Sequence, residues 1–369
     1  MSVAVLGTQP HAGHRLYEQR LASALSPLTR VAYLEPPTAP RSLGAVRRAQ
    51  LWVDDGRTLV QSAWTVPFTR RLGLDTLRDV AVVRAARSAA RRVGRPTALV
   101  HTEPSPVLGA FPQARAVLLV KDDYVVGAEL LGWRPEDVEE RLRRAVERAD
   151  AVVSVSPELR ERLRRFGVEA TVIPPGCFPG PGRAGPDPGR PLRAALLGGV
   201  SPRVLPGHLT AVLDAGVHLD VLGAQHRTFP DASTREEVER VLADPRVTWH
   251  GPVSAERVGA ILRGVDVGLV PYRDSSFNRA SFPLKTIEYL AAGLPVVATP
   301  LPALDWIGSD QVHVAAGPEE FATRVREVAA SASTAVSESC RGVAAQHSWE
   351  RRAADWAAVL GLDPAGDPR

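Results

Sequence analysis

The sequence of 369 residues predicts an α/β protein with two halves, each a doubly wound parallel sheet flanked by helices. Short β-branched runs are each followed by a stretch with helical periodicity, which is the pattern of βαβ units. This pattern occurs once before and once after a segment rich in Pro and Gly, Pro174 to Pro191, which excludes both a helix and an interior strand there. The segment therefore predicts a linker between two domains of similar size.

Each half contains a series of expected strands. In the first half they cover Val3–Leu6, Arg30–Leu34, Ala98–His101, Ala116–Val120, Ala151–Val155 and Glu169–Ile173. In the second half they cover Ala194–Gly198, Val217–Leu222, Val247–His250, Val265–Pro271, Pro295–Thr299 and Val312–Ala315. Ligands of open α/β sheets bind at the carboxyl ends of the strands, so the loops that follow strands are the place to seek function.

Several helices carry their own start signals. Pro135 opens one helix, Ser254 can cap a second, and Pro283 stands where a proline is tolerated because its missing N–H would be unpaired. The C-terminal segment HSWERRAADWAAVLG places Trp349, Ala353, Trp356 and Leu360 on one face. It predicts an amphipathic helix that needs a surface to dock on.

Composition excludes several classes of protein. Hydrophobic residues make up 44% and charged residues 23%, as in ordinary soluble globular proteins, and no apolar run approaches the ~18 residues of a spanning helix. The N-terminus lacks the basic region of a signal peptide, so we expect a first strand and a cytoplasmic location. Cys177 and Cys340 match no zinc or disulfide spacing, and no metal site is expected.

The net charge of +4 is compatible with an acidic partner but does not select one. Lys121 and Lys285 are the only lysines among 45 basic residues, and Asn278 is the only asparagine, which indicates a GC-rich coding bias. A surviving lysine then marks a place that requires a compact ammonium. The arginine-rich helix expected around Leu77 to Arg95 could rest on anionic lipid or be solvated, and solvation is favoured.

The segment from Val265 to Leu304 carries the richest chemistry. Its helix begins near Pro283, where the backbone N–H groups of Leu284 and Lys285, the lysine ammonium and the Ser281 hydroxyl offer a site for a diphosphate. Glu288 lies among apolar neighbours, where an unpaired carboxylate is costly, so it needs a hydrogen-bonding partner such as a vicinal diol. The alternative is an ordinary helix start with Glu288 on a solvated edge.

Other polar candidates follow other strands. In LLGGVSPRV, Gly198 and Gly199 permit close approach of a ligand to the backbone. Arg203 can donate two parallel hydrogen bonds to phosphate oxygens, and the alternative is a purely structural role for this arginine. In the first half the candidates are Gly13 with His14, His101 with Glu103, and Asp122 with Asp123. Adjacent aspartates point in different directions, which leaves at most one working acid or base. The alternative for His101 is a histidine of the core, and the alternative for Asp122 and Asp123 is the cap of a turn or helix.

The sequence FPLKTIEYLAAGLPVVAT resembles the C-domain signature of GT-B glycosyltransferases, in particular the family-4-like group. VAYLEPP, LLVKDDY, RADAVVSVSPELRERL with VIPPG, RVTWHGPVSAERVGAILRGVDVGLVPY and HSWERR resemble that group in the same order, over nearly the whole chain. The resemblance implies the GT-B fold, two Rossmann-like domains that face each other across a cleft. It implies a first, acceptor-side domain of residues 1–175 with 346–362, a linker at 176–191 and a nucleotide-sugar domain of residues 192–345.

The resemblance also implies roles for the candidates. Glu288 would bind the ribose, and the diphosphate would lie against Gly199, Arg203, Ser281, Leu284 and Lys285. Gly13 and His14 would face the acceptor, and His101, Glu103 and Asp123 are the catalytic candidates. Many members carry a second acid eight positions before the ribose-binding Glu, where this chain has Ala280. That departure leaves the donor sugar and the stereochemical course open.

We therefore expect a glycosyltransferase that moves a sugar from a UDP- or GDP-linked donor, with retention, to a small-molecule, lipid-linked or glycan acceptor. Arg203, Lys285 and the helix start can neutralise the departing diphosphate, so no metal or cofactor is expected. Nucleic acid is not an expected partner, and peripheral contact with the inner membrane face stays open. The alternatives are a sugar-nucleotide epimerase of the same fold and a non-catalytic GT-B-like auxiliary subunit.

Overall fold

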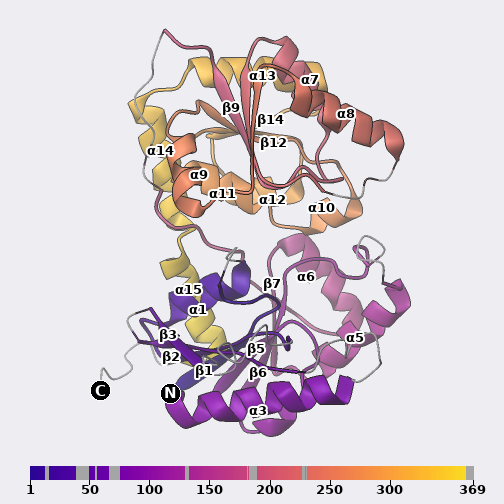
Figure 1. The fold of residues 1–369 in the computed structure, drawn as a ribbon, viewed down its shortest axis with the longest axis vertical. Helices are drawn as coiled ribbons and strands as arrows, with labels where there is room; N and C mark the ends of the chain where they lie inside the picture. The colour runs from indigo at the N-terminus through magenta and orange to yellow at the C-terminus, as the bar shows by residue number, and fades with distance from the viewer. Residues whose placement is uncertain are drawn as a thin grey trace. The chain divides into compact units, whose positions relative to one another are not determined.

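The computed structural model describes residues 1–12, 16–38, 50–54, 56–65, 75–128, 133–180, 182, 189–226, 229 and 231–362. The chain divides into two units (Figure 1). Unit 1 comprises Met1–Pro175 and Trp349–Arg369, and unit 2 comprises Gly176–Ser348. Each unit contains one sheet covered by helices, which confirms the predicted α/β class.

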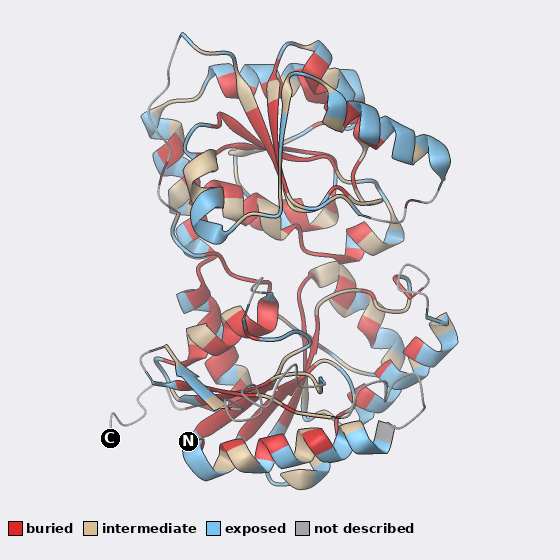
Figure 2. Ribbon diagram, in the orientation of Figure 1, coloured by how far each residue is buried: buried red, intermediate tan, exposed pale blue. Residues whose placement is uncertain are grey.

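Unit 1 contains an eight-stranded sheet in the order β3-β4-β2-β1-β5-β6-β7-β8. Its strands are β1 (Ser2–Leu6), β2 (Arg30–Leu34), β3 (Gln50–Val53), β4 (Thr58–Gln61), β5 (Ala98–His101), β6 (Arg115–Val120), β7 (Ala151–Ser154) and β8 (Thr171–Val172). All described pairs are parallel except β3 with β4. β1, β2 and β5 are buried almost throughout, as a parallel sheet covered on both faces requires (Figure 2).

The hairpin of β3 and β4 was not predicted. Its sequence LWVDDGRTLVQ contains an Asp-Gly pair, which is a strong short-range hairpin signal. Asp54 and Gly56 both have positive φ, at 51° and 79°, as tight turns of Asp and Gly allow. The hairpin adds an antiparallel edge to an otherwise parallel sheet.

Helices cover this sheet, and the last of them comes from the end of the chain. They are α1 (Tyr17–Leu25), α3 (Asp75–Val93), α4 (Val107–Ala110), α5 (Pro135–Glu147), α6 (Pro157–Leu163), the 3₁₀ turn η2 (Arg164–Phe166) and α15 (Trp349–Leu360). In Figure 1 the yellow α15 lies beside α1. The Tyr17 hydroxyl accepts from Trp356 Nε1 at 3.0 Å and donates to the carbonyl of Ile173 at 2.9 Å. The amphipathic final helix therefore buries its tryptophans in unit 1.

Unit 2 contains a six-stranded parallel sheet in the order β11-β10-β9-β12-β13-β14. Its strands are β9 (Arg193–Leu197), β10 (His218–Leu222), β11 (Val247–Gly251), β12 (Val267–Val270), β13 (Val296–Ala298) and β14 (Val312–Val314). Its helices are α7 (Pro206–Asp214), α8 (Ala232–Ala243), α9 (Ala255–Leu262), α10 (Ser276–Ala280), α11 (Leu284–Ala291), α12 (Pro302–Ile307), α13 (Pro318–Ala330) and α14 (Thr334–Gln346). Chain order reverses between β9 and β12, which makes their carboxyl ends the switch point of the sheet.

The start of the expected linker packs on unit 2. The amide of Cys177 donates to the carbonyl of His347 at 2.9 Å, and the amide of Gly180 donates to that of Ala291 at 3.1 Å. A Cβ on Gly180 would come within 2.5 Å of the same Ala291 oxygen, so only glycine permits this approach. These bonds hold the first linker residues against the ends of α14 and α11.

Candidate functional site

The loops after β9 and β12 meet the start of α11 at the switch point of unit 2. Gly198 directly follows β9 with φ of +113°, and a Cβ added there would lie 3.5 Å from Lys285 Cε. The lysine stem therefore passes beside the glycine backbone. Gly223, which follows β10, packs directly against the Gly198 backbone. A Cβ added to Gly223 would lie 2.2 Å from the Gly198 carbonyl oxygen. Without side chains, these glycines let the backbones that follow β9 and β10 pack against each other beside Lys285.

Arg203 is held in place on three sides. Its Nε donates to Asn278 Oδ1 at 2.6 Å, and Asn278 donates in turn to the carbonyl of Arg273 at 2.8 Å. The guanidinium carbon lies 5.1 Å from the ring centres of both Tyr272 and Phe277, which is the geometry of cation–π contact. Among the described residues neither terminal nitrogen of Arg203 has a partner. Arg203 thus presents two unused donors from a fixed position.

The start of α11 differs in detail from the expectation. The Leu284 amide, predicted to be free, donates to the carbonyl of Phe282 at 2.8 Å, and the Ser281 hydroxyl donates to that of Phe277 at 2.9 Å. Both donors bond to carbonyls within the same short segment, because these are the nearest acceptors. The Lys285 amide has no acceptor within the described part of the chain. Of the two backbone amides predicted to be donors at this helix start, that of Lys285 is the one that remains available.

Glu288 has a hydrogen-bonding partner of the kind that its surroundings demand, and Lys285 supplies it. Lys285 Nζ donates to Glu288 Oε2 at 2.6 Å, and the side chains are 21% and 14% exposed. The two residues are one turn apart on α11, at the spacing that allows side chains to meet. The pair keeps both charges compensated while both groups stay within reach of solvent.

Tyr289 anchors this part of α11 to the sheet. Its buried hydroxyl accepts from the amide of Leu197 at 2.5 Å and donates to the carbonyl of Ala195 at 2.8 Å. Its ring covers Gly268 of β12, where a Cβ would come within 2.3 Å of the ring. Burial raises the pKa of the Tyr289 phenol well above its usual value, so it remains neutral. Tyr289 therefore fixes the position of Glu288, its neighbour in sequence.

In unit 1 the candidate that retains an unused polar atom is His101, at the end of β5. The side chain is buried, and Nδ1 lies 2.9 Å from the carbonyl of Glu103. A carbonyl only accepts, so Nδ1 carries the proton and Nε2 is left as an acceptor. Nε2 is buried and has no partner in the described chain. Burial lowers the pKa of His101, so the imidazole is neutral at pH 7.

The other candidates of unit 1 have different surroundings. Asp123 accepts from Arg162 Nη1 at 2.7 Å and from the amide of Val126 at 3.1 Å, so both carboxylate oxygens are engaged in an ion pair and a turn. This geometry favours the alternative interpretation, a turn cap. The Glu103 carboxylate is exposed and lies 3.9 Å from Arg141. Gly13 and His14 lie outside the described residues.

Sequence reasoning missed the groups that hold Arg203. Tyr272, Phe277 and Asn278 lie in and after the loop that follows β12, and their spacing shows no period that predicts a common target. Asn278 had one signal, because it is the only asparagine of the chain. Gly199, predicted beside the diphosphate, is exposed, while Gly198 is the glycine that faces Lys285.

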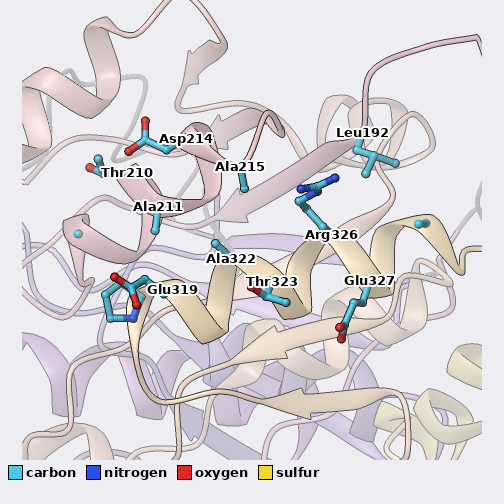
Figure 3. A pocket seen from close by; sticks show the side chains of 13 residues that line it. Leu192, Thr210, Ala211, Asp214, Ala215, Glu319, Ala322, Thr323, Arg326 and Glu327 are labelled. Atoms are coloured by element: carbon cyan, nitrogen blue, oxygen red, sulfur yellow. The ribbon is translucent and has the colours of Figure 1, made fainter.

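A groove elsewhere on unit 2 takes no part in this site. It has a volume of about 760 Å³ and lies between α7 and α13 (Figure 3). Its walls are mainly small or exposed side chains such as Ala211, Ala322 and Arg326. None of the candidate residues lines it. Among the described residues, no three His, Cys, Asp or Glu side chains converge as a metal site would require.

Two family models match this chain, one in each unit. Residues 54–177 match the model for Glycosyltransferase Family 4, and residues 202–331 match the model for Glycosyl transferases group 1. The chain belongs to the family-4-like glycosyltransferases of GT-B fold. The group 1 match contains Arg203, Lys285 and Glu288. The family match therefore covers the loop that carries Arg203 and the helix that carries Lys285 and Glu288.

One curated relative shares a segment with this family-4-like chain. TuaH of Bacillus subtilis (strain 168), whose name assigns it provisionally to teichuronic acid biosynthesis as a glycosyltransferase, is 43% identical over 75 residues. The aligned segment covers 20% of this chain and 19% of TuaH. The match therefore spans about a fifth of the length of the relative.

Solved structures share the fold over nearly the whole chain. Sucrose-phosphate synthase from Thermosynechococcus elongatus has a TM-score of 0.74 at 18% identity, with 98% of each chain covered. The Anabaena protein HepE in complex with UDP and glucose has a TM-score of 0.63 at 14% identity, covering 97% of this chain and 99% of HepE. An Escherichia coli structure described as trehalose-6-phosphate with UDP-2-fluoro glucose has a TM-score of 0.68 at 12% identity, with both chains fully covered. At these identities the likeness establishes the GT-B fold.

Proposed function

We propose that this chain transfers a sugar from a nucleoside-diphosphate donor, UDP- or GDP-linked, to a hydroxyl group of an acceptor. The observation that carries the proposal is that Lys285 lies beside Gly198 and pairs with Glu288 at the switch point, while Asn278 holds Arg203 in the loop after the same strand, β9. Two cations and a glycine backbone suit a diphosphate, and a carboxylate one helical turn away suits a ribose diol. The solved structures of HepE with UDP and glucose support a donor of this kind.

The leaving group accounts for the two cations. In the transfer, a bond forms between the acceptor oxygen and the anomeric carbon, and the bond from that carbon to the diphosphate oxygen breaks. The electron pair leaves with the diphosphate, and the acceptor proton passes to the leaving phosphate or to solvent. Donors that already point at the developing charge stabilise it without reorganisation, which is the role of the Arg203 terminal nitrogens and the Lys285 ammonium.

His101 is our candidate for orienting a sugar hydroxyl. Its Nε2 can only accept, so it can hold an O–H group but cannot supply a proton to a leaving group at neutral pH. The proposal includes retention of configuration, as family membership suggests. Position 280 holds a fully buried alanine, which has no carboxylate to offer to the donor sugar. The leaving diphosphate can then accept the acceptor proton.

Binding and product analysis together test the proposal. Isothermal titration with UDP, GDP and dTDP should show tighter binding of a ribonucleotide, and incubation with labelled donor should yield a glycosylated acceptor. Absence of any nucleotide binding would contradict the proposal and favour an auxiliary subunit. Interconversion of the donor sugar without an acceptor product would favour an epimerase. For the variant Lys285→Ala, Arg324→Ala is a matched control, because Arg324 pairs with Glu327 at the same i,i+3 spacing outside the site.

A further inference from the structure

The outward face of α3 carries a stripe of cations and apolar side chains. The inward face packs Ala86, Ala89 and Val93 against Leu59 and other core residues of unit 1. The exposed residues at spacings of three and four form what we call the α3 stripe: Leu77, Val80, Arg84, Arg87 and Arg91. Buried and exposed residues alternate along this helix in Figure 2. At 1.5 Å per residue the stripe is about 21 Å long.

The arginines of the α3 stripe have no partner within the described part of the chain. Arg84, Arg87 and Arg91 form neither an ion pair nor a hydrogen bond there. The arginines of α5 differ: Arg141, Arg143 and Arg144 each lie within 4.0 Å of a glutamate carboxylate. A coding bias toward arginine would affect both helices alike, so it does not explain why one set is neutralised and the other is not. The charge of the α3 stripe is available to an external anion.

Apolar side chains accompany these charges. Leu77 is 46% and Val80 is 47% exposed, at the N-terminal end of the α3 stripe. On the edge strand β3, Gln50 donates to Ser88 of α3 at 3.0 Å, which joins the strand to the helix. Trp52, two residues further along β3, projects on the same side as Gln50 and is 42% exposed. Arginine together with exposed Leu, Val and Trp is the composition of a membrane interface.

We propose that the α3 stripe docks unit 1 on an anionic phospholipid bilayer. The charges match the negative surface of such a bilayer, which attracts each nearby arginine by about 1 kcal/mol, or roughly five-fold in affinity. The exposed Leu77 and Val80 favour a lipid surface over nucleic acid, because they add nothing to contacts with phosphates. The proposal is independent of the donor site of unit 2.

Co-flotation of the full chain with vesicles tests the proposal. One set of vesicles is phosphatidylcholine alone, and the other also contains phosphatidylglycerol. The variant Arg84→Gln/Arg87→Gln/Arg91→Gln should bind the anionic vesicles about a hundred-fold more weakly than the unmodified chain. The control Arg141→Gln/Arg143→Gln/Arg144→Gln removes the same charge from α5 and should lose only a few-fold. Thermal unfolding of both variants checks that their folds are intact.

A second variant separates lipid contact from pure charge. Leu77→Ser/Val80→Ser should weaken binding to anionic vesicles several-fold at fixed charge and leave binding to a short DNA duplex unchanged. Equal losses in the two arginine variants, equal binding to neutral vesicles, or no vesicle binding at low salt would each overturn the proposal. Tighter binding of DNA than of anionic vesicles, lost in the α3 variant, would overturn it in favour of nucleic acid.

Discussion

The ammonium of Lys285 lies 2.6 Å from the carboxylate of Glu288, so the two charged groups assigned to different parts of the donor bind each other. In our account the diphosphate takes the lysine and the ribose diol takes the glutamate. Binding of the donor then exchanges one ion pair for two sets of hydrogen bonds. A fragment that carries the phosphates alone releases Lys285 from Glu288 and leaves the carboxylate without its cation.

The first prediction follows from this exchange. Glu288→Asp keeps the charge but shortens the side chain, which moves the carboxylate away from Lys285. An ion pair this exposed is worth about 0.2–1 kcal/mol, so the variant should bind pyrophosphate up to about five-fold more tightly than the unmodified chain. UDP, which also needs the carboxylate, should bind more weakly. Titration calorimetry measures both affinities, and Glu327→Asp serves as the control. If the variant bound UDP more weakly but bound pyrophosphate unchanged, the proposed exchange of the ion pair would be wrong. The contact between Glu288 and the ribose would still be supported.

The second prediction concerns the choice of lysine at position 285. Lys285→Ala should weaken UDP binding by about 1.5–3 kcal/mol, the usual contribution of hydrogen bonds to charged groups. Lys285→Arg should restore only part of this, because a planar guanidinium does not replace a compact ammonium where the site requires one. Full UDP affinity in the arginine variant would show that a compact ammonium is not required there.

The third prediction separates stability from binding. Tyr289→Phe leaves the Leu197 amide and the Ala195 carbonyl without the bridging hydroxyl. A lost partner of this kind costs about 1–3 kcal/mol in the free energy of unfolding. Denaturant titration should show this loss, while the UDP affinity of the folded variant should stay within a few-fold. A variant as stable as the unmodified chain would rule out this anchoring role.

The fourth prediction is a dependence of stability on pH. Burial lowers the pKa of folded His101, whereas the unfolded chain protonates near its usual pKa of about 6.5. The unfolded state therefore binds more protons as the pH falls, so the stabilisation is present above that pH and is lost below it. His101→Asn keeps a donor for the Glu103 carbonyl and removes the titrating group. Between pH 7.5 and 5.5 it should reduce the loss of stability by about 1 kcal/mol. An unchanged pH slope would exclude His101 as its source.

Much of the fold could be predicted because the strands of buried parallel sheets are apolar runs with clear ends. β2 and β5 have the predicted bounds, Arg30–Leu34 and Ala98–His101. β3 and β4 were missed because the edge strand is half-exposed and lacks a continuous apolar run. The Asp-Gly pair between them is the signal in the sequence that indicates this hairpin.

The candidate site was predictable only where its parts are close in sequence. Lys285 and Glu288 lie on one short helix, so a single motif includes both. Arg203 and Asn278 are 75 residues apart, and their contact exists only once the loops after β9 and β12 meet. The sequence predicted that Glu288 needs a hydrogen-bonding partner. It did not identify Lys285 as that partner, although the i,i+3 spacing permits the contact. Asp123 was placed among the catalytic candidates because sequence alone does not show that Arg162 and the Val126 amide use its oxygens.

We infer that unit 2 binds the donor by a hydrogen-bonded contact between the Glu288 carboxylate and the ribose diol. A 2′-deoxyribose offers one hydroxyl where ribose offers two, which leaves one charge-assisted hydrogen bond unmade. Competition binding of UDP against 2′-deoxy-UDP should therefore favour UDP by about ten- to a hundred-fold, and Glu288→Gln should shrink that preference. Equal affinities of the unmodified chain for the two nucleotides would contradict the claim, because Glu288 would then not bind the diol.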